Sequence, residues 1–202
     1  MNVSSAVVSD RAHPEDRVAV LPAGRGHRFV VADGAGGLGG GGRAAELVVA
    51  ALDQDPEDWC AWLSRLDIAV AADANAGEST SVVGAVYAGR ILGASVGDSE
   101  AWVIDSTSVH RLTEHQHRAR LGSGEAMPVA FEGMLVPDSA LVVASDGLFR
   151  GASADAIVDA VRTGADAREL AEVARGRSGR LYDDVGIVVV RAPGPSVPGE
   201  SR

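Results

Sequence analysis

Short apolar runs that end in turn residues predict most of the strands of this chain. The earliest runs stop at proline or at an Asp-Gly pair, as strands commonly do. From residue 79 onward, runs rich in Val, Ile, Ala and Thr are separated by glycine, which predicts an antiparallel meander. The predicted strands are residues 17–21, 27–32, 80–87, 90–96, 101–104, 109–112, 140–145 and 185–191.

Apolar residues at helical spacing predict two pairs of helices between these strands. The first pair covers residues 43–52 and a helix with Asp55 as N-cap, Pro56 at its first position and an apolar stripe that ends at Val70. The second pair covers residues 153–162 and 166–177. Trp59 and Trp62 lie on the stripe at helical spacing, so core packing is favoured over a ligand site.

The order of these elements predicts the fold class. Strands, two helices, strands, two helices and a last strand favour an α+β protein: a four-layer α-β-β-α sandwich of two mainly antiparallel sheets flanked by helix pairs. With 202 residues and 46% apolar composition, we expect a single domain over residues 1–191. Residues 192–202 are rich in Pro, Gly and Ser and are expected to form a disordered tail.

Charge and cysteine content narrow the possible functions. The net charge is −10 and all 18 basic residues are Arg, which argues against a nucleic-acid binder with a clustered basic face. The lone Cys60 excludes an intrachain disulfide and a Cys-pair zinc site. No apolar stretch is long enough to cross a membrane, and the N-terminus lacks the pattern of a signal peptide. We therefore expect a cytoplasmic protein without a membrane partner.

A glycine-rich segment at residues 34–39 satisfies the G-x-G-x-x-G pattern of dinucleotide-binding folds, and Asp53 lies near the distance expected for a ribose ligand. A dinucleotide fold requires the following helix to lead into a parallel strand, whereas here a second helix follows. Asp33 would also lie beside the pyrophosphate, which is electrostatically unfavourable. Dinucleotide binding is therefore a disfavoured hypothesis for this segment.

Acidic residues recur at the ends of the predicted strands. Any one Asp-Gly or Asp-Ser pair is ordinary turn chemistry, but five acidic elements at strand ends form a pattern. Carboxylates that converge at the rim of a sheet repel one another unless cations neutralise them, and oxygen ligands without His or Cys select Mg²⁺ or Mn²⁺. The elements are Glu15-Asp16, Asp33-Gly34, Asp98, Asp146-Gly147 and Asp183-Asp184.

Five segments, in order along nearly the whole chain, resemble the motifs of the PPM-type, metal-dependent protein serine/threonine phosphatases, the protein phosphatase 2C family. Each motif is weak alone, but their shared order is specific. The segments are RAHPED at residues 11–16, resembling R-x-x-N-E-D; VADGAGG at 31–37, resembling V-A-D-G-M-G-G; SVGDS at 95–99, resembling N-V-G-D-S; ASDGL at 144–148, resembling C-S-D-G-L; and DDVGI at 183–187, resembling D-N-x-T-V.

The resemblance implies a centre of two metal ions, Mn²⁺ or Mg²⁺, at one end of the sandwich. By this resemblance Asp33 bridges the two ions and the carbonyl of Gly34 binds one of them. Asp146 and Asp183 complete the ligands of the first ion. These three aspartates are therefore the expected catalytic residues.

The resemblance also assigns the other acidic residues. Glu15 and Asp16 correspond to residues that complete the ligands of the second ion, and Asp98 corresponds to a ligand of a weak third ion. Arg11 corresponds to the residue that binds the substrate phosphate, where a guanidinium suits tetrahedral oxygens.

The expected activity is hydrolysis of phosphoserine and phosphothreonine in proteins by a metal-activated water. This activity would oppose that of a serine/threonine kinase in signalling. The alternative is a degenerate phosphatase fold that serves as a non-catalytic binding or regulatory module. Pro14 in place of Asn and a shortened flap motivate this alternative, while retention of the aspartates opposes it.

Several other positions depart from the family pattern. Ala35 stands where some members carry a His that acts as general acid, and Glu100 stands where Arg is usual. The helical flap is expected to be reduced to a loop within residues 113–143. His115 and His117 in this segment are expected to be solvated loop residues rather than metal ligands.

Overall fold

The computed structural model describes residues 1–35, 40–53, 56–114, 116 and 119–193. Two five-stranded sheets lie face to face, and every strand pairing in this part of the chain is antiparallel. The first sheet has the order β1 (Asn2–Val8), β10 (Val185–Arg191), β9 (Ala140–Ala144), β6 (Glu100–Ile104) and β7 (Val109–Arg111). The second has the order β2 (Arg17–Ala23), β3 (Gly26–Ala35), β4 (Glu78–Tyr87), β5 (Arg90–Val96) and β8 (Val129–Met134).

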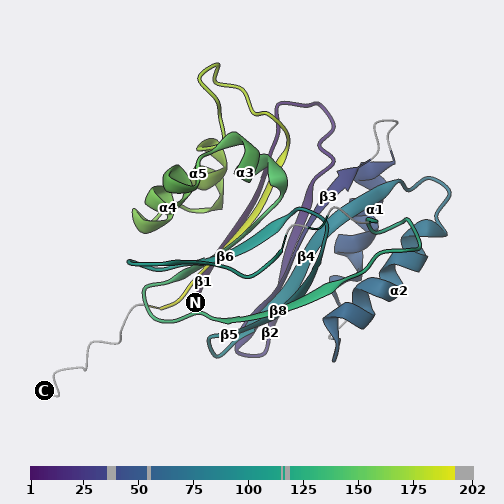
Figure 1. Ribbon diagram of the computed structural model, residues 1–202, viewed down its shortest axis with the longest axis horizontal. Helices are drawn as coiled ribbons and strands as arrows, with labels where there is room; N and C mark the ends of the chain where they lie inside the picture. Colours follow the sequence, from purple (N-terminus) through teal and green to yellow (C-terminus); the bar gives the residue numbers. More distant parts are fainter. Residues whose placement is uncertain (36–39, 54–55, 115, 117–118, 194–202) are drawn as a thin grey trace, which may run out of the picture.

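Helices cover the outer face of each sheet (Figure 1). On the second sheet lie α1 (Gly41–Ala50), a short 3-10 helix (Ala51–Asp53) and α2 (Trp59–Ala71). On the first lie α3 (Asp146–Gly151), α4 (Ala154–Arg162) and α5 (Ala167–Glu172). The predicted four-layer α+β sandwich is therefore confirmed.

Three apolar cores separate these four layers, one between the sheets and one under each set of helices. The strands alternate between two of the cores because successive side chains point to opposite faces of a sheet. In β10, Ile187 and Val189 face the helices, whereas Val188 and Val190 face the other sheet. Strands buried on both faces need an almost continuous run of apolar residues, which explains the valine-rich segments of the sequence.

Two strands were not expected from the sequence. In β1, Ser4 and Ser5 interrupt the apolar pattern, but pairing with β10 satisfies the backbone, and the Ser4 hydroxyl accepts a hydrogen bond from the backbone N–H of Ala167. Strand β8 lies at the edge of its sheet, and it carries exposed side chains such as Val129 and Met134. Neither segment has the alternating pattern by which a strand is normally identified.

Two helix predictions need correction, and one helix was not predicted. The second helix begins at Trp59 with Asp58 as its N-cap, and Asp55, the predicted cap, lies outside the described residues. The Asp58 carboxylate accepts the backbone N–H of Ala61, which satisfies a donor that the helix itself leaves free. Helix α5 ends at Glu172, although the sequence suggested residue 177. Helix α3 was not expected, because Asp-Gly at its start resembles a turn.

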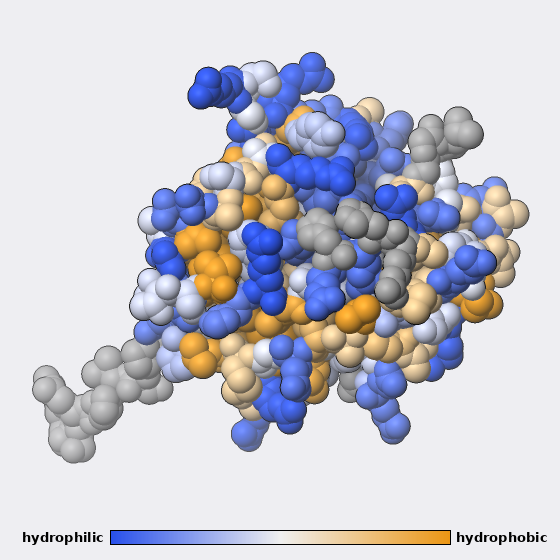
Figure 2. All heavy atoms as spheres, in the orientation of Figure 1, coloured by the Kyte–Doolittle hydropathy of each residue, from blue (hydrophilic) through white to orange (hydrophobic). Residues whose placement is uncertain are grey.

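Strand β10 ends at Arg191, and residues 194–202 of the tail predicted to be disordered lie outside the described residues. None of the described helices combines the length and apolarity needed to span a membrane. Hydrophilic side chains cover much of the face seen in Figure 2, with apolar side chains in small groups among them.

Candidate metal centre

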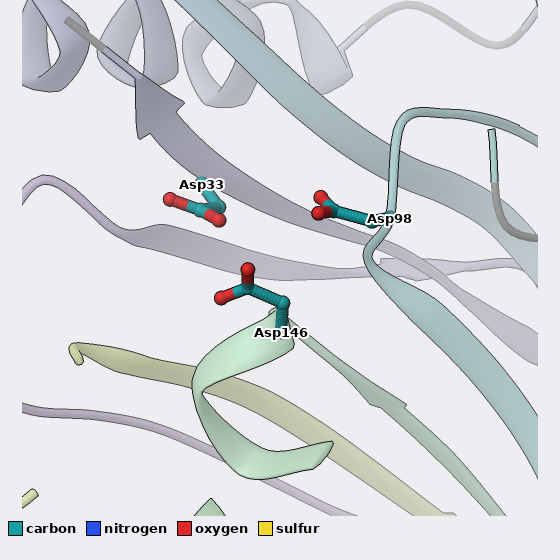
Figure 3. A group of neighbouring side chains, drawn as sticks. All are labelled: Asp33, Asp98 and Asp146. Carbon is teal, nitrogen blue, oxygen red and sulfur yellow. The ribbon is translucent and has the colours of Figure 1, made fainter. Parts of the chain in front are cut away.

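Three carboxylates converge at the candidate site. Asp33 lies near the end of β3, Asp98 lies in the turn between β5 and β6, and Asp146 begins α3 directly after β9. Figure 3 shows the three side chains pointing toward one another, and one carboxylate oxygen of each lies within 4.8 Å of those of the other two. Asp98 and Asp146, which follow Asp33 by 65 and 113 positions in the sequence, are thus brought close to it by the two sheets.

Close backbone packing fixes the end of β3 that carries Asp33. A Cβ atom on Gly34 would lie 2.3 Å from the carbonyl carbon of Gly41 and 2.9 Å from the carbonyl oxygen of Glu15. Only glycine therefore allows the start of α1 and the segment before β2 to approach this strand. The Ser79 hydroxyl donates to the carbonyl oxygen of Asp33 at 3.0 Å, which anchors the strand from the neighbouring β4.

A tight turn holds Asp98. Gly97 has φ of +98°, a conformation that disfavours other residues, and a Cβ there would also meet the side chain of Thr80 at 2.5 Å. The hydroxyls of Thr80 and Ser99 lie 2.8 Å apart, and the backbone N–H of Gln116 donates to the Gly97 carbonyl at 3.0 Å. These contacts hold both sides of the turn.

Asp16 lies buried beneath Asp33. Its Oδ2 accepts hydrogen bonds from the Ser145 hydroxyl at 2.7 Å and from the Gly186 N–H at 2.6 Å, and its carboxyl group is hydrogen-bonded to Asp33. Burial raises the pKa of Asp16 to about 6 despite these hydrogen bonds. Asp16, which directly precedes β2, thus links this strand to the ends of β3, β9 and β10 through hydrogen bonds.

Asp33 has the most perturbed acidity of the cluster. Burial, followed by the charges of Asp16 and Asp146, raises the pKa of its carboxyl group to about 9, and Asp183 adds to the effect. Burial and the nearby Asp98 also raise the pKa of Asp146. Without a cation, the Asp33 carboxyl group therefore keeps a proton at neutral pH that an isolated carboxyl group would lose.

Arg11 lies beside Asp183 and Glu15, which were also predicted to belong to the metal centre. Its Nη2 lies 2.8 Å from Oδ1 of Asp183, and its Nη1 lies 3.9 Å from Oε2 of Glu15 and 3.8 Å from Oδ2 of Asp184. The Arg11 side chain is half exposed, so it faces both the acidic residues and solvent.

Two residues of this region, Asp184 and Arg150, were given no individual role from the sequence. Asp184 is buried, accepts a hydrogen bond from the Glu15 backbone N–H at 2.7 Å, and also accepts one from the Ser9 hydroxyl. Arg150 forms ion pairs with both Asp146 and Asp98. Its spacing of four residues from Asp146 would have indicated the first pair, had a helix been expected there.

The donor set fits a hard divalent cation. The three converging groups offer only carboxylate oxygens, the ligands preferred by Mg²⁺ and Mn²⁺. The raised pKa of Asp33 shows how strongly its negative charge is opposed in the absence of a cation. A divalent ion there would offset the repulsion, so these residues can hold a metal.

The segment in which the flap was predicted to be reduced to a loop contains no helix in the described part of residues 113–128. Leu121 forms an antiparallel bridge with Ser79, which seats the loop against β4. The buried carboxylate of Asp67 on α2 accepts three backbone N–H groups of the loop, those of Gly122 at 2.7 Å, Gly124 at 3.1 Å and Ala126 at 2.9 Å. His115 and His117 lie outside the described residues.

The dinucleotide hypothesis has no support in the topology. The strand after the two helices, β4, pairs with β3 in the antiparallel direction, whereas a dinucleotide-binding unit needs a parallel partner. Gly36, Gly37 and Gly39 of the glycine-rich segment lie outside the described residues.

Comparison with known proteins identifies the fold. No family model and no curated protein sequence matches the chain. Among solved structures, the S. agalactiae serine/threonine phosphatase matches with a TM-score of 0.81 at 17% identity, covering 95% of this chain and 99% of that one. The chain has the fold of the PP2C-type serine/threonine phosphatases. Serine/threonine phosphatase Stp1 from Staphylococcus aureus matches at 0.77 with 17% identity, covering 96% of this chain and 94% of that one.

A third match agrees with the first two. The Mycobacterium tuberculosis serine/threonine phosphatase PstP/Ppp has a TM-score of 0.74 and 21% identity, and covers 95% of this chain and 99% of its own. The PP2C-type fold thus accounts for nearly the whole chain. The resemblance inferred from the five sequence motifs is confirmed at the level of fold.

Proposed function

We propose that this chain is a metal-dependent phosphatase that hydrolyses phosphoserine and phosphothreonine in proteins. The observation that carries the proposal is the convergence of Asp33, Asp98 and Asp146 from three separate segments, within 4.8 Å of one another, in a PP2C-type fold. Partly buried carboxylates at this spacing are costly to ionise unless positive charge, from a metal ion or a nearby arginine, offsets their repulsion.

We assign two Mn²⁺ or Mg²⁺ ions to this centre. Asp33, Asp146 and Asp183 would hold the first, while Asp33, the Gly34 carbonyl and Glu15 would hold the second. The bound ions would supply a water molecule whose pKa is lowered to near neutrality. They would also supply positive charge that attracts the substrate phosphate. Each of these donors belongs to a strand end or to a segment directly adjoining one.

Asp16 receives a positioning role in this scheme instead of a place among the direct ligands. Its Oδ2 is already held by the Ser145 hydroxyl and the Gly186 N–H, and its carboxyl group is hydrogen-bonded to Asp33. It is almost completely buried, with 2% exposure, so it faces Asp33 rather than a substrate. Asp16 would therefore orient the Asp33 carboxylate.

Arg11 would bind the phosphate of the substrate. Its guanidinium lies within 2.8 Å of Asp183 yet remains half exposed, so it stands between the acidic cluster and solvent. A planar guanidinium can donate two parallel hydrogen bonds to phosphate oxygens. The contact with Asp183 fixes the side chain beside the position at which a phosphate would approach the cluster.

The reaction needs no covalent enzyme intermediate in this scheme. The oxygen of water bonds to phosphorus, the bond from phosphorus to the serine or threonine oxygen breaks, and the products are the free hydroxyl and inorganic phosphate. The substrates are phosphoproteins, which are produced by serine/threonine kinases. We place this activity in the cytoplasm.

The test is hydrolysis of phosphothreonine and phosphoserine peptides with and without added Mn²⁺. Turnover should require the metal, and Asp33→Ala and Asp146→Ala should each lower it more than about 100-fold, since even residues that only support metal ligands change activity 10–100-fold. Asp159→Ala, an exposed aspartate on α4, is the matched control and should retain full activity. Metal-independent turnover, or full activity of Asp33→Ala, would overturn the proposal.

A second result would favour the non-catalytic binding module. If the wild-type protein binds phosphopeptide with Mn²⁺ but releases no phosphate, the fold serves recognition alone. Pro14, whose ring nitrogen cannot donate a hydrogen bond, occupies the position beside Glu15 at which the family pattern has Asn.

A further inference from the structure

Arg150 connects two of the three converging carboxylates. Its Nη1 lies 2.9 Å from Oδ2 of Asp146, and its Nη2 lies 3.2 Å from Oδ2 of Asp98. Asp146 is one helical turn before Arg150 on α3, whereas Asp98 comes from the turn between β5 and β6, 52 residues earlier in the chain. One guanidinium therefore bridges two segments that the sheets bring together.

The bridge uses different nitrogens for the two carboxylates. A guanidinium stays charged at every pH relevant to proteins and presents its five N–H donors in a fixed plane, so it can hold two carboxylates at a set separation. The oxygen of Asp98 and the oxygen of Asp146 that face Arg150 are both engaged in this way. A metal ion on that side would have to displace the guanidinium from those oxygens.

The third carboxylate lacks this contact. The ion pairs of Arg150 run to Asp98 and Asp146 and leave Asp33, which is held from below by Asp16. Positive charge from Arg150 thus reaches Asp98 and Asp146 directly, whereas Asp33 forms no ion pair with the described arginines. Of the three carboxylates, Asp33 is therefore the one left for a cation from solution.

We propose that Arg150 is a built-in counter-ion that holds Asp98 against Asp146 and keeps an additional divalent cation from binding at Asp98. The inference rests on the proposed metal centre and deepens it: Arg150 sets how many ions the centre takes. In this chain the place that the sequence resemblance gives to a weak third ion is filled by a guanidinium. Arg150 acts on the metal through its carboxylate partners, as a positioning residue.

The experiment counts Mn²⁺ ions per chain by isothermal titration calorimetry and checks the count by electron paramagnetic resonance of the bound metal. The full-length wild type is compared with Arg150→Ala, Arg150→Lys and the double variant Arg150→Ala, Asp98→Asn. Arg43→Ala is the matched control, because Arg43 is also a half-exposed arginine paired with an aspartate, Asp73, outside the cluster. Circular dichroism verifies that each variant is folded.

Arg150→Ala should bind one more Mn²⁺ per chain than the wild type, or bind its weakest Mn²⁺ at least tenfold more tightly. Adding Asp98→Asn should remove that gain, and Arg43→Ala should not differ from the wild type. Arg150→Lys should lie between the wild type and Arg150→Ala, because it keeps the charge but lacks the planar donors that bridge both carboxylates. A purely structural role for Arg150 would lower stability without changing the count.

Identical Mn²⁺ stoichiometry and affinity in the wild type and Arg150→Ala, with an active wild type, would overturn this inference and leave the proposed phosphatase intact. A gain of one ion in Arg150→Ala together with an inactive wild type would support the inference and refute the phosphatase. Absence of Mn²⁺ binding and of hydrolysis in every variant would overturn both.

Discussion

Asp33 is the residue on which the electrostatics of the cluster converge. Its carboxyl group is partly buried, hydrogen-bonded to Asp16 and repelled by Asp146 and Asp183, and its pKa is raised to about 9 from an ordinary value of 3.8. The folded protein without metal therefore binds a proton that the unfolded chain releases near pH 4. A raised carboxyl pKa contributes stability that is present below the unfolded value and is lost as pH rises toward the folded value.

This linkage predicts the behaviour of Asp33→Asn in metal-free protein. The amide cannot ionise, so the variant should be more stable than the wild type at pH 8 by at least about 1 kcal/mol, or about 2–4 °C in melting temperature for a chain of this size. The gain should shrink toward pH 4, and phosphatase activity should be lost. Thermal melts in EDTA across pH 4–9 check this, with Asp159→Asn as the control. An Asp33→Asn variant less stable than wild type at pH 8 would contradict the assigned repulsion.

At the scale of elements, strand ends and helix starts are fitted together by glycines. A Cβ on Gly147, the second residue of α3, would lie 1.9 Å from the carbonyl oxygen of Asp184 before β10. The close approach of these two backbones sets Asp146 beside Asp183. The glycine of the Asp-Gly pair therefore serves tertiary packing, in addition to any role in a turn.

Gly147→Ala should accordingly destabilise the protein by about 1–3 kcal/mol, because a backbone carbonyl must shift to admit the methyl group. Metal affinity should fall as well, since Asp146 and Asp183 would move apart. Gly176→Ala is the matched control, because the nearest atom to its added Cβ would be 3.8 Å away. Urea denaturation and Mn²⁺ titration measure the two effects, and equal stability losses in both variants would refute the packing argument.

The loop before β8 depends on a side chain of α2. The two oxygens of the buried Asp67 carboxylate accept the backbone N–H groups of Gly122, Gly124 and Ala126. Without the carboxylate, these loop donors lose their partners, which costs about 1–3 kcal/mol for each buried group left unsatisfied. One side chain on a helix thus holds a loop that is more than fifty residues away in sequence.

Asp67→Ala should therefore release the loop. Amide hydrogen exchange at these three residues should accelerate at least tenfold, while Asp67→Asn, which keeps one acceptor oxygen, should have a smaller effect. Exchange in the strands of the first sheet should be unchanged. Unaltered exchange at residues 122–126 in Asp67→Ala would show that other contacts hold the loop.

For the whole molecule, the two sheets bring acidic segments from across the chain to one centre, so metal binding should report on folding. An ion that binds the folded chain alone stabilises it by about 2.7 kcal/mol at 100 times its dissociation constant. Mn²⁺ should therefore raise the melting temperature by about 5–10 °C relative to EDTA. The shift should vanish in Asp33→Ala and persist in Arg43→Ala. An equal shift in all three proteins would place the metal elsewhere.

Much of the architecture follows from local pattern. Valine-rich runs such as that of β10 predict strands because a strand covered on both faces must be apolar throughout, and their order with the helix pairs predicts a layered sandwich. The motifs around Asp33, Asp98, Asp146 and Asp183 mark candidate site residues, because acidic residues at strand ends place charge on a rigid rim. These features depend on neighbours within a few residues.

Other features were decided by tertiary structure. Strand β1 forms because β10 offers a partner, although its own serines weaken the pattern. Which carboxylates meet, and that Arg150 reaches Asp98 as well as Asp146, depend on the register of strands far apart in the chain. The sequence by itself therefore determined the acidic residues and their strands, while tertiary packing decided which charges face one another, because repulsion and pairing act through space and not along the chain.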